Sequence, residues 1–130
     1  GTDGMQNNML KEAKEGTLIR SATESPAVDY LELLFHNNPD IAVKIFEKLI
    51  GHIEEEAQAD LVFYDYKPRT DLNADNFGSH LLFGFGKPSD VMTRGEFRMR
   101  NKHLVGIDES RIRENARKQS KRLWSAMKAL

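Results

Sequence analysis

The chain has 130 residues, of which 39% are hydrophobic and 30% charged, as expected of one water-soluble globular domain. It contains no cysteine, which excludes disulfides, thiolate metal ligands and a cysteine nucleophile. The formal net charge of −1 hides an asymmetry, because residues 1–93 hold 8 Lys or Arg against 16 Asp or Glu and residues 94–130 hold 11 against 4. A basic second part favours an anionic partner such as nucleic acid, or pairing between acidic and basic surfaces.

The first four residues have the character of a sequence added in cloning rather than of part of the folded domain. GTDG at 1–4 has the character of a cloning remnant, so we expect a single α+β domain over residues 5–130. No apolar run approaches the ~20 residues that a membrane helix needs, and no charged-then-apolar leader is seen. We therefore expect no membrane partner and a cytoplasmic protein.

Three helices are predicted in the acidic part. Residues 5–15 have moderate helix propensity and end where a glycine follows. Ser-Pro at 25–26 is typical of a helix start, and apolar residues then recur at three- and four-residue steps through a helix over 26–36. Asn-Pro at 38–39 repeats this signal and starts an apolar face that continues to about residue 57. The short connection between the last two helices predicts a helical hairpin.

Three strands are predicted next. Residues 60–66, DLVFYDY, are rich in β-branched and aromatic side chains, and residues 80–86, HLLFGFG, follow a polar connection over 69–79. Residues 95–107 alternate between apolar and charged side chains, as in a half-buried strand. We expect these strands to form an antiparallel sheet.

The last predicted helix is basic and amphipathic, with Asp108 and Ser110 as candidate caps. Its apolar residues fall within an arc of about 100° on a helical wheel. They are Ile112, Ala116, Leu123, Ala126, Met127 and Leu130. The predicted fold is therefore α+β, with an N-terminal helical hairpin, a three-stranded antiparallel sheet and this helix packed on one sheet face.

In element order, residues 39–130 resemble the double-stranded-RNA-binding domain, which runs helix, three strands, helix and carries basic residues on its final helix. The sequence departs from the family at RENAR, 113–117, where the family has a Lys-Lys-x-Ala-Lys pattern. GSH at 78–80 only partly matches the family's Gly-Pro-x-His loop. Because element order alone does not establish function, we assign the chain to no family.

Two groups of cations are candidates for binding nucleic acid. Alternation places Arg98, Arg100 and Lys102 on one side of the third strand, where Tyr64 and Tyr66 would add aromatic rings for unpaired bases. On the last helix, the cations lie outside the apolar stripe and would neutralise phosphates; the candidates are Arg113, Arg117, Lys118 and Lys121. The alternative interpretation for both groups is a solvated surface.

Other chemistry has weaker signals. Pro39-Asp40 with Asp65-Tyr66-Lys67 contains the residue types of a metal-dependent nuclease, but a helix start explains Asp40 equally well. No three ligands are spaced as in a metal site around His36 or His52, and GFGK at 84–87 lacks the full phosphate-loop spacing. We therefore predict no catalytic residue, no metal and no cofactor.

These observations favour a small, non-catalytic accessory domain that binds RNA or single-stranded DNA through its basic strand and last helix. The alternative is a protein-interaction module, such as an inhibitor or assembly factor, which docks a partner or a second copy through its acidic and basic surfaces. A metal-dependent nuclease is a distant third hypothesis.

Overall fold

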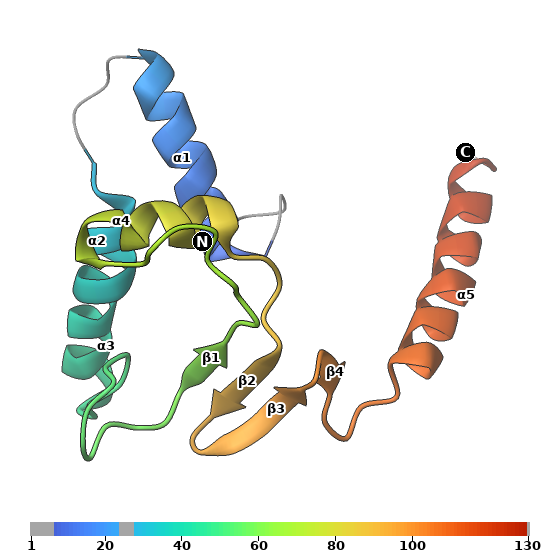
Figure 1. Cartoon of the computed structure of the whole chain (residues 1–130). Helices are drawn as coiled ribbons and strands as arrows, with labels where there is room; N and C mark the ends of the chain where they lie inside the picture. Colours follow the sequence, from blue (N-terminus) through green and yellow to red (C-terminus); the bar gives the residue numbers. More distant parts are fainter. Residues whose placement is uncertain (1–6, 24–27, 130) are drawn as a thin grey trace.

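The computed structural model describes residues 7–23 and 28–129, so the GTDG segment and the Ser-Pro start signal at 25–26 lie outside the described residues. The protein is α+β, as predicted, with helices first, an antiparallel sheet and a final helix (Figure 1). The elements, with π-helical segments written η, are α1 (Met9–Thr23), α2 (Tyr30–Glu32), η1 (Leu33–Asn37), α3 (Asn38–Phe46), β1 (Leu61–Phe63), α4 (Ala74–Ser79), η2 (His80–Gly84), β2 (Asp90–Thr93), β3 (Glu96–Arg100), β4 (His103–Leu104) and α5 (Glu109–Met127).

Helix α1 continues past the glycine at which the sequence predicted its end. The Asn8 side chain accepts hydrogen bonds from the backbone N–H groups of Leu10 (3.0 Å) and Lys11 (3.3 Å), which fixes the start of the helix. Gly16 lies against the Tyr30 ring, and a Cβ atom at this position would be 2.6 Å from Tyr30 Cζ. The glycine therefore permits close contact between α1 and α2, and this contact outweighs its low helix propensity.

The predicted helical hairpin around Pro39 is wrong, because α2, η1 and α3 form one continuous helix (Figure 1). Asp29 caps its start by accepting from the N–H groups of Leu31 and Glu32. Pro39 has no N–H to donate, and the π-helical turn before it changes the hydrogen-bonding pattern, with Asn38 N–H donating to the Leu33 carbonyl.

The same helix ends at Phe46 rather than near residue 57. Glu47 adopts a left-handed conformation with φ of 52° and donates its N–H to the Val43 carbonyl at 2.9 Å. The chain then returns to the helix, and Gly51 packs on Pro39 so closely that a Cβ atom would be 2.9 Å from Pro39 Cβ. Packing of this loop on the buried proline outweighs the apolar periodicity that predicted a longer helix.

The strand predicted over 80–86 is also wrong, since these residues mostly continue the helix formed by α4 and η2. Asn73 caps this helix by accepting from the N–H groups of Asp75 (3.0 Å) and Asn76 (3.1 Å). The Asn76 side chain accepts from the Asn73 N–H in return, which completes a capping box. The helix packs against α1, and Leu81 lies buried at this contact.

The sheet has four antiparallel strands in the order β1-β2-β3-β4, rather than the three predicted. Of the strand predicted over 60–66, only Leu61–Phe63 is confirmed, as β1, whereas β2 was not predicted. The segment expected as one strand over 95–107 contains β3 and β4 as a hairpin. Two-residue turns with positive φ at both residues separate the last three strands, at Arg94-Gly95 and at Asn101-Lys102.

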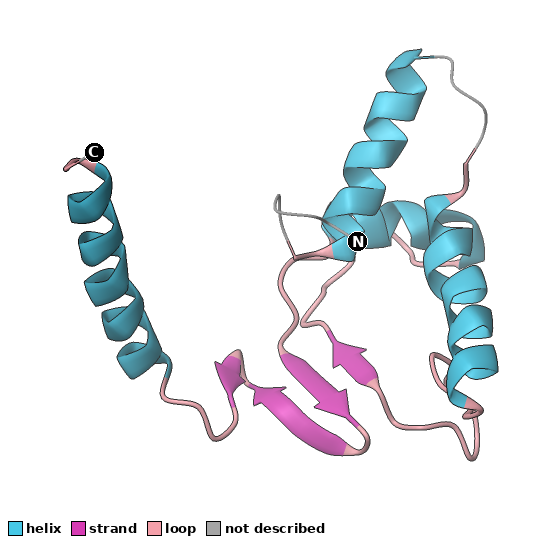
Figure 2. Ribbon diagram, turned by 180° about the vertical axis from the view of Figure 1, so that it is seen from behind, coloured by secondary structure: helices cyan, strands magenta, loops and turns pink. Residues whose placement is uncertain are grey.

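Helix α5 begins as predicted, with Asp108 accepting from the Arg111 N–H at 3.0 Å. It does not pack on a sheet face: it stands apart from the other helices, beyond the β4 edge (Figures 1 and 2). Gly106, with φ of 70°, turns the chain between β4 and α5, and every residue of α5 except Glu109 is exposed. Among the described helices, none is long and apolar enough to cross a membrane.

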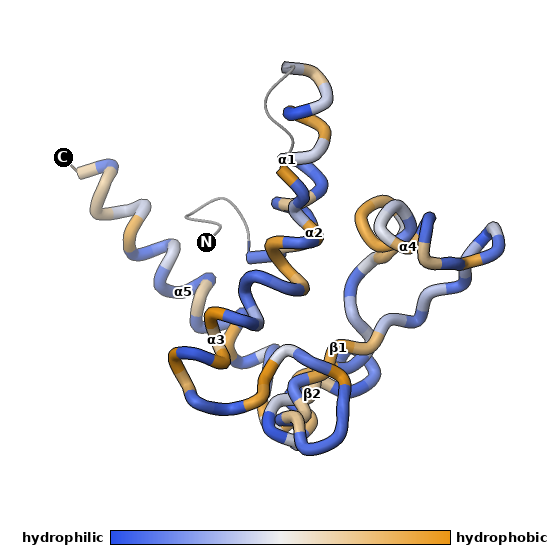
Figure 3. Tube along the Cα trace, turned by 90° about the vertical axis from the view of Figure 1, so that its left-hand side faces the viewer, coloured by the Kyte–Doolittle hydropathy of each residue, from blue (hydrophilic) through white to orange (hydrophobic). Residues whose placement is uncertain are grey.

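The structure buries little apolar surface for its size. Among the described hydrophobic residues, Ala13 (3% exposed) and Leu81 (4%) are the buried ones. The accessible surface is 11007 Å², compared with roughly 7,000 Å² for a compact protein of this mass. Figure 3 shows hydrophobic positions recurring along the uncovered α3 and α5. The fold therefore leaves about 4,000 Å² more surface in solvent than a compact domain would.

Candidate functional site

Of the three cations predicted on the sheet, two lie where the sequence placed them. Arg98 and Arg100 are on the exposed side of β3, but Lys102 lies in the following turn, where its N–H donates to the Ser89 carbonyl at 2.8 Å. Arg98 pairs with Glu96 at 2.9 Å, and the Arg100 guanidinium lies 4.8 Å from the centroid of the Phe97 ring. Both arginines are thus already in contact with neighbours on their own strand.

The cations of α5 do not lie near those of the sheet, because α5 stands apart from the sheet (Figure 1). Arg113 pairs with Glu109 and Lys118 with Glu114, each at 2.7 Å and one helical turn apart. The structure therefore does not combine the two predicted cation groups into one surface. Contact of these seven side chains with nucleic acid stays a prediction, since nothing in the structure tests it.

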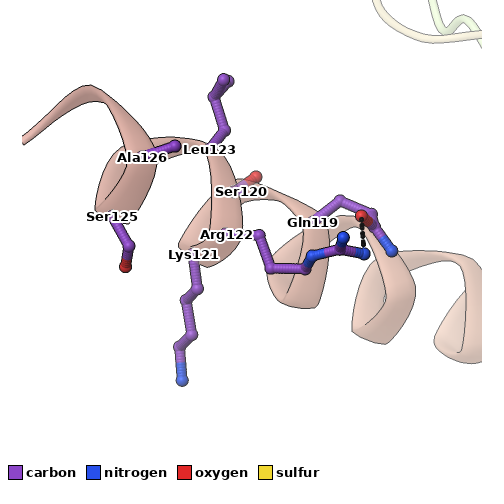
Figure 4. A pocket seen from close by; sticks show the side chains of 7 residues that line it. All are labelled: Gln119, Ser120, Lys121, Arg122, Leu123, Ser125 and Ala126. Atoms are coloured by element: carbon purple, nitrogen blue, oxygen red, sulfur yellow. Dashed lines mark hydrogen bonds between the residues drawn. The ribbon is translucent and has the colours of Figure 1, made fainter. Parts of the chain in front are cut away.

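A hollow on α5 is formed by residues of that helix alone, from Gln119 to Ala126 (Figure 4). Arg122 donates to Gln119 Oε1 at 3.3 Å, while the Lys121 side chain points away from that pair. Side chains that diverge from a single helix do not enclose a ligand, so this hollow is not a convincing binding site.

A groove between α1, η2 and the sheet is the most enclosed of the hollows described. The rings of Tyr64 and Phe85 lie on one side with centroids 4.9 Å apart, and Lys14 Nζ lies 5.2 Å from the centroid of Phe83. Burial raises the pKa of Tyr64 above its usual value. Lysines also line the groove; they are Lys11, Lys14, Lys87 and Lys102. The groove combines aromatic surface with positive charge.

A polar cluster around His80 was not predicted from the sequence. Tyr66 Oη lies 2.5 Å from His80 Nδ1, and Thr70 Oγ1 lies 3.1 Å from His80 Nε2. Tyr66 also packs on Gly84, where a Cβ atom would be 2.7 Å from its hydroxyl oxygen. Since both ring nitrogens already have partners, His80 ties the loop after β1 to η2 and offers no free nitrogen as a base or metal ligand.

The histidine and carboxylate groups considered in the sequence do not assemble into a metal site. His36 Nε2 lies 3.8 Å from Glu32 Oε2, one helical turn away, with both side chains exposed. Within residues 7–23 and 28–129, no group of three or more His, Asp or Glu side chains is arranged to hold a metal ion.

Comparison with known proteins points to a different class from the one predicted. The chain is similar to a protein of Methanococcus aeolicus named 5'-deoxyadenosine deaminase, with 29% identity over 129 residues, 95% of this chain and 30% of the relative. A Methanocaldococcus jannaschii protein of the same name is 27% identical over 122 residues, 89% of this chain and 29% of the relative. No family model matches the chain, and no solved structure does.

The predicted non-catalytic nucleic-acid-binding domain is therefore wrong, since both curated relatives carry the name of an enzyme. The same finding overturns the protein-interaction module and the nuclease as descriptions of the chain. The fold also departs from the double-stranded-RNA-binding order, because a helix over residues 74–84 lies between β1 and β2 and the sheet has four strands. The chain spans less than a third of the length of the relatives it matches.

Proposed function

We propose that this chain is one part of an enzyme that removes the amino group from an adenine nucleoside such as 5'-deoxyadenosine. The observation that carries the proposal is the similarity to 5'-deoxyadenosine deaminases along 95% of the chain. A likeness that extends from the helical part through the sheet to α5 favours a shared architecture over a shared short motif.

The large exposed surface supports the proposal that this chain is one part of a larger enzyme. A standard protein interface covers about 800 Å² on each partner, whereas this chain leaves roughly 4,000 Å² more in solvent than a compact domain. Large obligate interfaces resemble a domain core cut in half, and in this proposal part of the surplus is such an interface. The relatives are more than three times as long as the matched segment, and in this proposal a comparable remainder covers these faces.

The reaction exchanges one group on the adenine ring. Water adds its oxygen to C6, the bond from C6 to the exocyclic nitrogen breaks, and ammonia leaves as the ring becomes a hypoxanthine. In this proposal, the described residues contribute the scaffold: the contact of α1 with η2 around Leu81 and the four-stranded sheet hold the segment in one shape.

The test is to replace the matched 129 residues of the Methanococcus aeolicus deaminase with this chain and to measure ammonia release from 5'-deoxyadenosine. We expect the chimera to release ammonia and the relative lacking the segment to release none. As a matched control, the corresponding segment of the Methanocaldococcus jannaschii protein is placed in the same position, which tests how well the host tolerates a divergent segment. A folded chimera without activity, beside an active control, would contradict the proposal.

A further inference from the structure

Helix α5 presents an apolar stripe that nothing in the described chain covers. Ile112, Leu123, Trp124 and Met127 are each more than half exposed. With 100° per residue, these four side chains fall within an arc of about 120° along one side of the helix. An amphipathic helix in a folded protein derives most of its stability from packing of such a face. The stripe thus has the pattern of a helix that packs against another surface.

Positive charge borders this stripe on both sides. On the helical wheel, Arg117 lies just beyond the stripe on one flank and Arg111 and Arg122 lie on the other. Arg113 falls within the arc of the stripe and pairs with Glu109. From Glu109 to Met127 the helix holds six Lys or Arg against two Glu, and those two pair with Arg113 and Lys118. A surface complementary to this helix is therefore apolar at its centre and acidic at its rim.

The area left uncovered indicates what kind of body carries that surface. A second copy docking through an interface of standard size would cover about 800 Å² of this chain, roughly a fifth of the surplus. The part of the relatives that this chain does not match is more than twice its size, and a body of that size can cover both the stripe and the remaining apolar faces.

We propose that α5 docks through its apolar stripe into an acid-rimmed groove on the remainder of a deaminase-type protein, the portion corresponding to the unmatched length of the relatives. This inference rests on the proposed function, since the function supplies the body that α5 contacts. Beyond the proposed function, this inference names α5 as the helix that makes the contact and describes the receiving surface as apolar with an acidic rim.

Trp124 makes the proposal measurable, because it is the single tryptophan of the chain and lies on the stripe. The full chain is mixed with the Methanococcus aeolicus deaminase lacking its matched segment, and the signal of a Trp124→Phe chain is subtracted. We expect the emission of Trp124 to shift to shorter wavelength and its quenching by acrylamide to fall several-fold. Added salt should weaken binding several-fold, because it screens the cations from the acidic rim.

Two substitutions of equal charge separate the stripe from the rest of α5. Leu123→Asp places a carboxylate in the stripe and should weaken binding at least tenfold. Ser125→Asp places the same charge on the opposite side of the helix and should change affinity by less than threefold, while circular dichroism checks that both variants keep the helix. Equal effects of the two substitutions would overturn the proposal.

The outcomes distinguish this proposal from the proposed function. Ammonia release with a Trp124 that stays exposed would overturn docking through α5 and leave the function in place. A shielded Trp124 in a complex without deaminase activity would support docking and contradict the function. Absence of any binding would overturn the docking proposal. The proposal would also be overturned if Trp124 were already shielded in the chain alone and light scattering gave the mass of a dimer.

Discussion

The region from α1 to β4 and the helix α5 are held by contacts of different range. In the first region, residues far apart in the chain meet: Asp60 accepts from the Arg94 N–H at 2.7 Å, and β1 pairs with β2. In α5, the hydrogen bonds and ion pairs described are local, and its link to the sheet is the Leu104 N–H donating to Glu109 at 3.3 Å. Contacts within this chain therefore fix how the elements of the first region pack together. For α5, they fix only that the segment is a helix.

The largest expected difference between the two regions concerns leucine truncation. Leu81→Ala should lower the free energy of unfolding by about 2–4 kcal/mol, because it opens a cavity at the contact between η2 and α1. Leu123→Ala on α5 is the matched control and should change it by less than about 0.5 kcal/mol, since that side chain is already in solvent. Urea unfolding followed by circular dichroism measures both. Similar losses for the two variants would show that α5 packs within this chain.

A smaller effect is expected from two glycines that lie close together. In Gly84→Ala, the new methyl group displaces the Tyr66 ring, which costs about 1–3 kcal/mol of folding free energy. The higher helix propensity of alanine offsets up to about 1 kcal/mol of this cost. We expect a net loss of about 1 kcal/mol and a changed imidazole NMR signal of His80, the partner of Tyr66. Gly86→Ala should change neither quantity, because no residue other than its two chain neighbours lies within 4 Å of the added carbon. An unaltered His80 signal in Gly84→Ala would contradict the described contact.

The smallest expected effect is a pH dependence confined to the first region. The Arg94 N–H and the Gln58 side chain, which bond to Asp60, hold the pKa of this carboxyl below its usual value of 3.8. Since the folded-state pKa is the lower one, this stabilisation is present above pH 3.8 and is lost as the pH falls through the folded-state value. Thermal unfolding across this acid range should show a shallower dependence on pH in Asp60→Asn. An identical dependence in both proteins would remove Asp60 as its source.

Local sequence signals predicted elements of the fold only where tertiary contacts did not override them. The cap at Asp108 and the strand at β1 were found because each depends on a few adjacent residues. The end of α3 was missed because Gly51 packs on Pro39, a contact that apolar periodicity does not contain. HLLFGFG was read as a strand because alternation in a short apolar run does not distinguish a strand from a buried helix. Asn73, the N-cap seven residues before that run begins, was the sequence signal that could have indicated a helix.

The candidate site was predicted less well than the fold. Clustered cations suggested an anionic partner, but charge composition does not reveal that Arg98 and Arg113 have carboxylate neighbours on their own elements. The cluster of Tyr66, Thr70 and His80 depends on the fold of the loop after β1, so no spacing pattern marks it. The proposed function rests on similarity over nearly the whole chain, which the residue patterns considered in the sequence did not reveal.

The two tight turns at Arg94-Gly95 and Asn101-Lys102 also bear on the order in which the protein assembles. They join β2, β3 and β4 within residues 90–104, so these strands can find one another without closing a long loop. Hairpins of this kind form in about 1–10 μs, whereas β1 must first be brought across the intervening α4 and η2 to reach β2. We therefore expect the three-stranded meander to nucleate folding, and β1 with its attached helices to join afterwards.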